Sequence, residues 1–360
     1  MRMLRYCMPR VRRRGYGLGN ELLPWARAFL ASQVLDATLL PPAFGMNRRG
    51  YWRDFFTAPD DWIQHRALEL LLPVVEFGEA EYLACGAGDV VQALRRFARE
   101  RELYRRHGYV LVTEGLWGGF RHVEAARAFV RSTLHRSRYA PANLLKVYER
   151  LDRRRIVVAM HVRMGDFAPA MTAERYREVT NASLPIEWFC HVAEQLRAAY
   201  ADDWQLLLIT DGRPDQLEPL TSAFSCVSTA DMNNNDCSDV LALADADLLV
   251  CSSSTYSSLA AFLSESPYLW FGPTLHAHPE GCYSTHGFTA ERGYADGPTA
   301  AAVEQYVQLG SGAWDGRGVV VEMDGVIPPA TLAAACRRRD ARQAWSDLVR
   351  SGVAPAPAPR

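Results

Sequence analysis

The chain has 360 residues, of which 49% are hydrophobic and 22% charged, and its formal net charge at pH 7 is -1. This composition is typical of a globular protein that is long enough for two domains. The near-zero net charge excludes the strongly basic balance of a general nucleic-acid binder, so a charged ligand would have to be bound locally.

The sequence contains no run of about 18 apolar residues that could span a bilayer. Its basic start, MRMLRYCMPRVRRRG, is followed by no apolar stretch of the kind found in secretion signals. The eight cysteines are scattered and include no CxxC pair, which is typical of free thiols in a reducing compartment. We therefore predict a cytoplasmic protein without an integral membrane segment.

The N-terminal residues predict a strand, a glycine loop and a helix. An apolar run from Met3 to Met8 precedes GYGLGN at Gly15 to Asn20, and helical periodicity begins near Glu21. The glycines allow either a close approach of backbone to a ligand or a tight turn with positive φ. A dinucleotide-binding G-x-G-x-x-G pattern is not completed, because Leu22 stands at the third glycine position.

From Pro59 to Arg153 the pattern is mainly helical. Two segments of the N-terminal half, Trp52 to Phe56 and Glu114 to Phe120, place aromatic residues beside glycine or charge. Core packing is the first interpretation of both segments, and a platform on which a sugar ring stacks is the second.

A charge cluster at Asp152 to Arg155 suggests a domain boundary. We predict a helix-rich N-terminal domain over 1–152, a second domain over 153–350 and a flexible Pro/Ala tail over 351–360. In the second domain short apolar strands alternate with helices, which indicates a doubly wound parallel sheet. The predicted strands are Ile156 to His161, Gln205 to Thr210, Phe224 to Ser228, Asp247 to Cys251 and Tyr268 to Phe271.

Polar residues follow three of these strands. His161 ends the first strand and Arg163 and Asp166 follow it, Asp211 follows the second, and Ser252 to Thr255 follow the fourth. Because the carboxyl ends of parallel strands share one edge, the three loops should converge. An arginine fork and a hydroxyl-rich helix N-terminus both bind anionic oxygens, so we predict a diphosphate site. A structural ion pair between Arg163 and Asp166, and an ordinary N-cap in the serine run, are the alternatives.

Four motifs in order resemble the fucosyltransferase superfamily of α1,2-, α1,6- and protein O-fucosyltransferases. They read GLGNELLPWA, HVRMGD, LLITDG and DVLALADADLLVCSSSTYSSLAAFL, and they span Gly17 to about Leu263. The resemblance implies the GT-B fold, in which two Rossmann-like domains face each other across a cleft. It also implies that the C-terminal domain holds most of the donor, GDP-fucose.

The resemblance assigns roles to individual residues. It places Arg163 at the β-phosphate of the donor and His161 and Asp239 near the guanosine. The Ser/Thr loop would border the diphosphate and the glycine loop would close over the sugar; these residues are Ser254, Thr255 and Tyr256, and Gly17, Gly19 and Asn20.

These roles imply an inverting glycosyltransferase that needs neither a metal nor another cofactor. Arg163 would stabilise the negative charge that develops on the departing diphosphate. The acceptor would be a hydroxyl of a glycan or a secondary metabolite, helped by a carboxylate base. Glu21 and Asp166 are the candidates for this base, and helix capping by Glu21 and loop bracing by Asp166 are equally open.

The chain departs from the family pattern at three positions. Met164 replaces a second arginine, Gly212 replaces a second acidic residue, and Ser253 replaces a common asparagine. A different nucleotide sugar as donor is therefore one alternative. A non-catalytic paralogue that binds nucleotide sugars is another.

Overall fold

The computed structural model describes residues 3–10, 16–86, 88–117, 119–120, 122–172, 175–176, 182–277, 283–284, 306–307 and 317–350. The predicted tail at 351–360 lies outside these residues. The chain divides into two compact units, of which the first reaches Arg138 and the second begins at Tyr139. None of the helices in the described part is long and apolar enough to cross a membrane.

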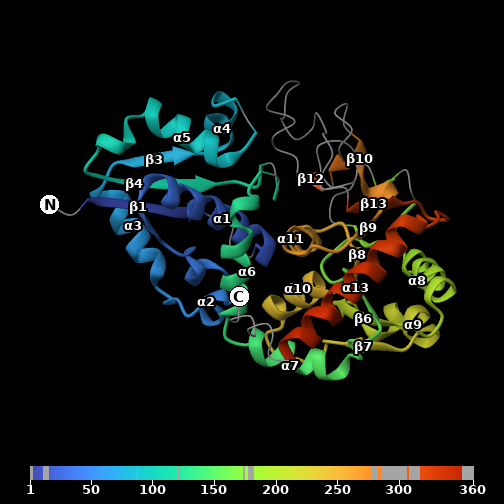
Figure 1. Cartoon of the computed structure of the whole chain (residues 1–360). Helices are drawn as coiled ribbons and strands as arrows, with labels where there is room; N and C mark the ends of the chain where they lie inside the picture. Colours follow the sequence, from blue (N-terminus) through green and yellow to red (C-terminus); the bar gives the residue numbers. More distant parts are fainter. Residues whose placement is uncertain are drawn as a thin grey trace. The chain divides into compact units, whose positions relative to one another are not determined.

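The first unit is built on a four-stranded parallel sheet with the order β2-β1-β4-β3 (Figure 1). Its strands are β1 (Leu4–Arg10), β2 (Thr38–Leu39), β3 (Val74–Phe77) and β4 (Gly108–Glu114). Its helices are α1 (Leu18–Leu35), η1 (Phe44–Met46), α2 (Tyr51–Asp54), α3 (Asp61–Leu71), α4 (Glu79–Ala84), α5 (Val90–Glu100), η2 (Leu103–Arg105), η3 (Glu124–Ala126) and α6 (Arg127–His135).

The prediction of a mainly helical stretch after Pro59 is wrong for β3 and β4. Both strands are short, and a short apolar run has the same local pattern in a strand as in a buried helix. Pairing with β1 decides the outcome for β4, which aligns with it from Leu4 opposite Gly108 to Arg10 opposite Glu114.

The second unit contains a six-stranded parallel sheet with the order β13-β9-β8-β5-β6-β7. Its strands are β5 (Ile156–Val162), β6 (Trp204–Thr210), β7 (Cys226–Ser228), β8 (Leu248–Cys251), β9 (Tyr268–Phe271) and β13 (Gly318–Val321). Its helices are α7 (Ala140–Arg150), α8 (Ile186–Tyr200), α9 (Pro214–Ala223), α10 (Asp236–Asp245), α11 (Thr255–Leu263), η5 (Gly272–Thr274) and α13 (Pro329–Arg350). A small separate sheet has the order β10 (His276–Ala277), β11 (Tyr283–Ser284) and β12 (Tyr306–Val307).

The α/β class and the doubly wound parallel sheet of the C-terminal half are thereby confirmed. Both units are α/β units around a parallel sheet. Each of the five predicted strands is present, with boundaries shifted by a few residues, and β13 adds a sixth. The two units divide before α7, although the charge cluster that suggested a boundary follows this helix. α7 packs against α10, where Asn143 Nδ2 donates to Ser238 Oγ at 3.2 Å.

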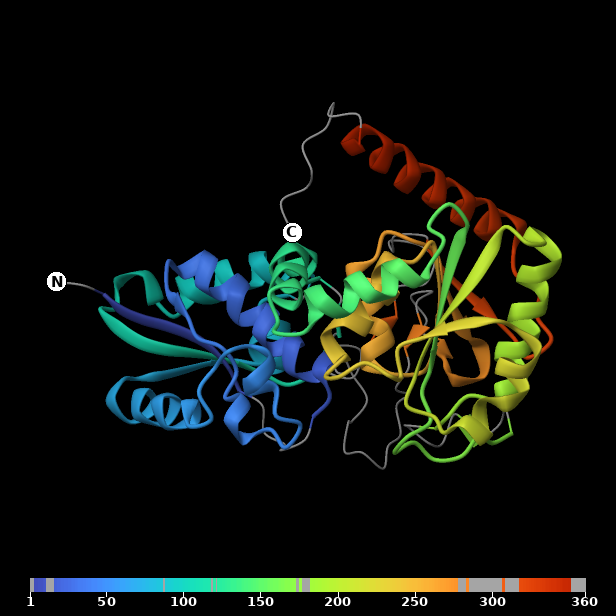
Figure 2. The ribbon, with the colours of Figure 1, turned by 90° about the horizontal axis from the view of Figure 1, so that it is seen from below.

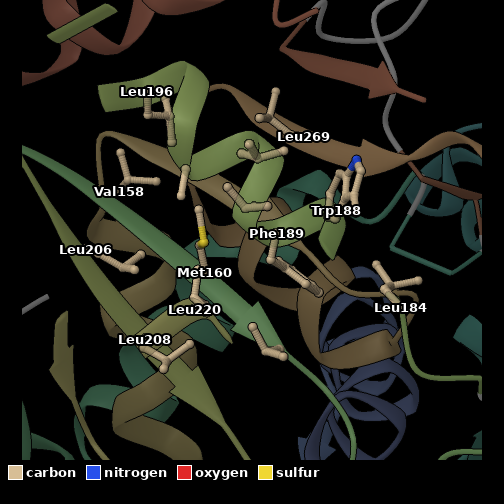
Figure 3. Close-up of a cluster of buried hydrophobic side chains, with 14 of the residues drawn as sticks. Val158, Met160, Leu184, Trp188, Phe189, Leu196, Leu206, Leu208, Leu220 and Leu269 are labelled. Carbon is tan, nitrogen blue, oxygen red and sulfur yellow. The ribbon is translucent and has the colours of Figure 1, made fainter. Parts of the chain in front are cut away.

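The core of the second unit lies between β5, β6 and the helices α8 and α9. Every residue of β5 is buried, as expected for a central parallel strand that is covered on both faces. Figure 3 shows Val158 and Met160 of β5 beside Leu206 of β6, with Phe189 and Leu196 of α8 over them. Elsewhere in this unit α10 contacts β5 and α11 contacts the neighbouring strand β8.

Candidate functional site

The strand order of the second unit reverses between β5 and β8. From β5 the chain continues to β6 on one side, and from β8 it continues to β9 on the other side. In open parallel sheets, ligands bind beyond the carboxyl ends of the strands at such a switch point. β5 ends at Val162 and β8 ends at Cys251. Arg163 and Ser252, which follow directly, therefore lie where a ligand site is expected in this unit.

His161 lies on the face of β5 opposite the α8 side. Alternate strand residues point to opposite faces, and Met160 belongs to the core on the α8 side. The His161 Nδ1 atom lies 2.7 Å from Ser257 Oγ, and its ring centre lies 5.0 Å from that of Tyr256. Burial, followed by the charge of Arg163, lowers the pKa of His161 to about 3. The imidazole is therefore neutral at physiological pH.

The hydroxyl of Ser252 joins the ends of β5 and β8. It donates to the carbonyl oxygen of His161 at 2.6 Å and accepts the backbone N–H of Arg163 at 3.0 Å. The Ser252 N–H in turn donates to Ser257 Oγ at 3.1 Å. Ser257 therefore contacts both the turn after β8 and the imidazole of His161.

The serine run caps α11. Ser254 is the N-cap residue and accepts the backbone N–H of Ser257 at 3.3 Å, and the helix continues through Thr255 and Tyr256. The Tyr256 phenol donates to the backbone oxygen of Asp236 in α10. The N-cap interpretation is thus confirmed, and it is compatible with anion binding. The first N–H groups of a helix have no acceptor within the helix, and the helix dipole favours negative charge there.

Arg163 is held by two carboxylates. Its two terminal nitrogens donate to Asp211 Oδ2 and Asp166 Oδ1, and its side chain is 21% exposed. The guanidinium carbon lies 5.0 Å from the centre of the Phe167 ring. The ion pair with Asp166 that the sequence left open is present, and Asp211 adds a second one.

The loop after β5 and the loop after β6 interlock through Asp211. Its Oδ1 accepts the backbone N–H of Met164 at 2.8 Å. A Cβ atom on Gly165 would lie 2.1 Å from Asp211 Oδ2, so a side chain there would displace the carboxylate. A Cβ atom on Gly212 would lie 3.0 Å from Met164 Sδ. Met164 is buried in the core, so two of the departures from the family pattern, Met164 and Gly212, pack against each other.

Asp239 is a buried carboxyl group with one unused oxygen. It lies in α10, which packs against α11, and it is 5% exposed. Its Oδ2 accepts the hydroxyl of Thr229 at 3.0 Å, whereas its buried Oδ1 has no hydrogen-bond partner among the described residues. Burial raises the pKa of Asp239 well above its ordinary value.

The glycine loop belongs to the first unit. Gly17 is the N-cap residue of α1 with φ -70°, so the alternative that it needs positive φ is wrong. The helix begins at Leu18, before Glu21, and Gly19 is buried in its first turn. Asn20 Oδ1 is buried and has no hydrogen-bond partner within the described part of the chain.

Glu21 is buried in the same turn and is 3% exposed. Its Oε1 accepts a hydrogen bond from Asn47 Nδ2, which also donates to the backbone oxygen of Tyr16 at 3.1 Å. Burial raises the pKa of Glu21 to about 7, and the bond from Asn47 offsets only part of this effect. A carboxyl group that titrates near neutral pH is suited to accepting a proton.

The aromatic segments of the first unit mostly pack in its interior. Phe55 stacks on Phe44 with ring centres 5.0 Å apart, and Trp117 stacks on Tyr82 at 4.6 Å. Core packing is therefore confirmed for Phe55 and Trp117. Phe56 is 69% exposed, so a stacking role stays a prediction for this residue.

The structure brings most of the predicted residues of the second unit together at the ends of β5, β6 and β8, with Asp239 on the adjoining α10. The sequence alone does not indicate Ser257 and Asn47 as site residues, because their partners are distant in the chain and no local pattern marks them. Among the described residues, no group of three His, Cys, Asp or Glu side chains could hold a metal ion. The predicted residues placed by the second unit are His161, Arg163, Asp166, Asp211, Asp239, Ser254, Thr255 and Tyr256, and those placed by the first unit are Gly17, Gly19, Asn20 and Glu21.

No protein-family model matches the chain, and no curated protein matches it. Several solved structures do match it.

Two of these structures are named as glycosyltransferases, and a third is named as a complex with GDP-fucose. Fucosyltransferase NodZ from Bradyrhizobium is 15% identical, with 73% of this chain and 94% of that chain covered and a TM-score of 0.43. The E. coli ADP-heptose lipopolysaccharide heptosyltransferase II is 11% identical, with 95% and 99% covered and a TM-score of 0.41. POFUT1 in complex with GDP-fucose is 10% identical, with 73% and 96% covered and a TM-score of 0.37.

Proposed function

We propose that the chain is a glycosyltransferase that takes a sugar from a nucleotide diphosphate donor, with GDP-fucose as the first candidate. The observation that carries this proposal is the meeting of Arg163 and the α11 N-terminus at the β5–β8 switch point, with the buried carboxyl group of Asp239 on α10, the helix that packs against α11. An arginine fork and a helix N-terminus both suit a diphosphate.

Arg163 is the proposed catalytic residue on the leaving group. Breaking the bond between the anomeric carbon and the diphosphate leaves negative charge on the phosphate oxygens. A guanidinium already held in place, here by Asp211 and the Phe167 ring, stabilises this charge without reorganising. The reaction so proposed requires no metal.

Glu21 is the proposed general base. The acceptor hydroxyl would attack the anomeric carbon on the side opposite the diphosphate, which inverts the configuration there, and its proton would pass to a carboxylate. Glu21 suits this step because burial raises its pKa to about 7. Asp166, the other candidate, is already bonded to Arg163.

Asp239 supports guanine as the base of the donor. Its unused Oδ1 can accept hydrogen bonds, and guanine offers donors at N1 and at its 2-amino group. A donor with another base or another sugar is the alternative. The acceptor would be a hydroxyl of a glycan or a small molecule.

A panel of nucleotides and nucleotide sugars tests the donor by thermal shift. A ligand at 100 times its Kd stabilises the folded state by about 2.7 kcal/mol. We expect GDP and GDP-fucose to raise the melting temperature most, because their Kd values should be the lowest of the panel. A selective shift with UDP or ADP compounds would show that the nucleotide assignment is wrong. Binding of GDP-fucose without any release of GDP would favour the non-catalytic paralogue.

Substituting Arg163 tests the catalytic assignment. Arg163→Ala should lower kcat/KM by about 100- to 1000-fold, the usual cost of losing one preorganised charge-stabilising donor. Arg96→Ala is the matched control, because Arg96 forms an exposed ion pair with Glu100 on α5. Full activity of a folded Arg163→Ala protein would contradict the assignment.

A further inference from the structure

We propose that the donor diphosphate displaces Asp166 from Arg163, whereas Asp211 stays bonded and keeps the guanidinium in position. The two carboxylates that share this arginine thus have opposite effects on the donor. This inference rests on the proposed function, in which Arg163 binds the diphosphate.

The charges around Arg163 make an exchange necessary. Its guanidinium carries one positive charge and contacts two carboxylates, Asp166 and Asp211. A diphosphate adds at least two further negative charges within a few ångströms, and like charges at that distance repel. Removing one carboxylate from the guanidinium relieves this repulsion and leaves N–H groups that can bind a phosphate oxygen.

Asp211 is anchored on several sides. Its Oδ1 accepts the Met164 N–H at 2.8 Å, and its Oδ2 accepts from Arg163. The backbone of Gly165 approaches Asp211 so closely that no side chain fits between them. The Asp211 side chain is 32% exposed. Moving it would break a backbone hydrogen bond as well as the ion pair.

Asp166 is much easier to move. Its side chain is 68% exposed, against 32% for Asp211, so water can solvate the Asp166 carboxylate at the position where Arg163 contacts it. Ion pairs as exposed as this one contribute little to stability. Of the two carboxylates, Asp166 is therefore the one that a stronger anion replaces.

Opposite outcomes are expected for the two carboxylates. Asp166→Asn removes the competing charge, so the Kd for GDP should fall by about two- to fivefold. Asp211→Asn removes the group that orients Arg163, so kcat should fall by about 100-fold, the typical effect of misplacing a catalytic group. Neither substitution should change the Kd for guanosine, which has no diphosphate.

Calorimetric titration of the full chain with GDP and with guanosine tests the exchange, and steady-state kinetics separate KM from kcat. Arg163→Ala is measured alongside. It should raise the Kd for GDP at least about tenfold and leave the Kd for guanosine unchanged. Asp340→Asn is the matched control, because Arg339 is 19% exposed and also bonds two carboxylates, Asp203 and Asp340, of which Asp340 is 62% exposed. This control should leave both Kd values unchanged.

The possible results separate this inference from the proposed function. If Arg163→Ala leaves GDP binding unchanged, the diphosphate is not at Arg163 and the proposed function is wrong in that respect. If Arg163→Ala lowers the affinity for GDP and Asp166→Asn either lowers it too or leaves it unchanged, Asp166 is not displaced by the diphosphate. In that case only the proposed exchange is wrong. If a folded Asp211→Asn protein keeps the kcat of the unmodified chain, Asp211 does not position Arg163, and that part of the inference is wrong.

Discussion

At the scale of single residues, Glu21 shows how burial sets the chemistry of a carboxyl group. Among the described residues its carboxylate accepts one hydrogen bond, from Asn47, while burial removes most of its hydration. The cost of burying the charged form exceeds the gain from one neutral donor, so the pKa rises to about 7. A group in this condition lowers the stability of the fold at the pH where it ionises.

The stability of the protein should therefore depend on pH through Glu21. The folded-state pKa of Glu21 lies above its ordinary value, 4.5. The contribution of Glu21 to the free energy of unfolding is thus fully present below about pH 4.5, and it is lost as the pH rises through about 7. The loss amounts to roughly 3 kcal/mol for a shift of this size. Glu21→Gln keeps an acceptor for Asn47 and should remove this part of the dependence, measured by urea unfolding at pH 5 and pH 8.

Glu79 provides the control for Glu21, because burial also raises the pKa of Glu79 to about 7. Glu79→Gln should likewise reduce the pH dependence of stability. Only Glu21→Gln should also remove the acidic limb of the pH profile of kcat/KM. Equal activity profiles for the two variants would exclude Glu21 as the base.

At the scale of elements, the site depends on how closely two loops approach each other. The turn after β5 and the turn after β6 share the Asp211 carboxylate, and Gly165 leaves room for it. The Arg163 side chain is oriented by this contact, so the geometry of the turn and that of the arginine are linked.

Gly165→Ala should disturb the site while Gly17→Ala should not disturb the fold. A Cβ atom at Gly165 would lie 2.1 Å from Asp211 Oδ2, so the carboxylate must leave Arg163. A Cβ atom at Gly17 meets nothing within 4 Å, and the φ of -70° there suits any residue. We expect Gly165→Ala to lower kcat by about 100-fold and Gly17→Ala to melt like the unmodified chain.

The measurements are kcat and the melting temperature of both glycine variants. An active Gly165→Ala protein would show that Asp211 is not needed to position Arg163. If Gly17→Ala folds normally but loses activity, the loss supports the predicted role of the glycine loop at the sugar.

At the scale of the whole molecule, the C-terminal helix is tied to the sheet of the second unit. Figure 2 shows α13, coloured red, passing the loop that leads into β5. Arg342 on this helix bonds both oxygens of Asp247, at 3.1 Å and 2.5 Å, and the backbone oxygens of Arg153 and Arg155. Asp247 is fully buried and also accepts the backbone N–H of Val157 at 2.9 Å.

Arg342→Ala should lower the free energy of unfolding of the second unit by about 3–5 kcal/mol, because it leaves the buried carboxylate of Asp247 without its counter-charge. Urea unfolding measures the change. Arg338→Ala on the same helix removes only an exposed pair with Glu265 and should cost less than about 1 kcal/mol. A similar small cost for both variants would show that Arg342 does not anchor the helix.

Local patterns in the sequence determined the alternating elements of the second unit and the polar residues at its strand ends. Strand runs such as β5 and the capping run at Ser254 are recognisable locally, because periodicity and cap chemistry depend on neighbouring residues. In the first unit, β3 and β4 were missed, because short apolar runs become strands only when a partner such as β1 pairs with them.

Only the tertiary structure decided which of the polar residues share contacts. Asp211 reaches Arg163 because β6 lies next to β5, and Ser257 reaches His161 because α11 contacts β8, which also lies next to β5. Asn47 reaches Glu21 in the same way, from the segment after β2. Such contacts join residues far apart in the chain, and they set the burial and the charge that each side chain experiences. Local sequence patterns therefore identify Arg163 as a candidate site residue, and the packing of distant segments determines which groups hold its side chain.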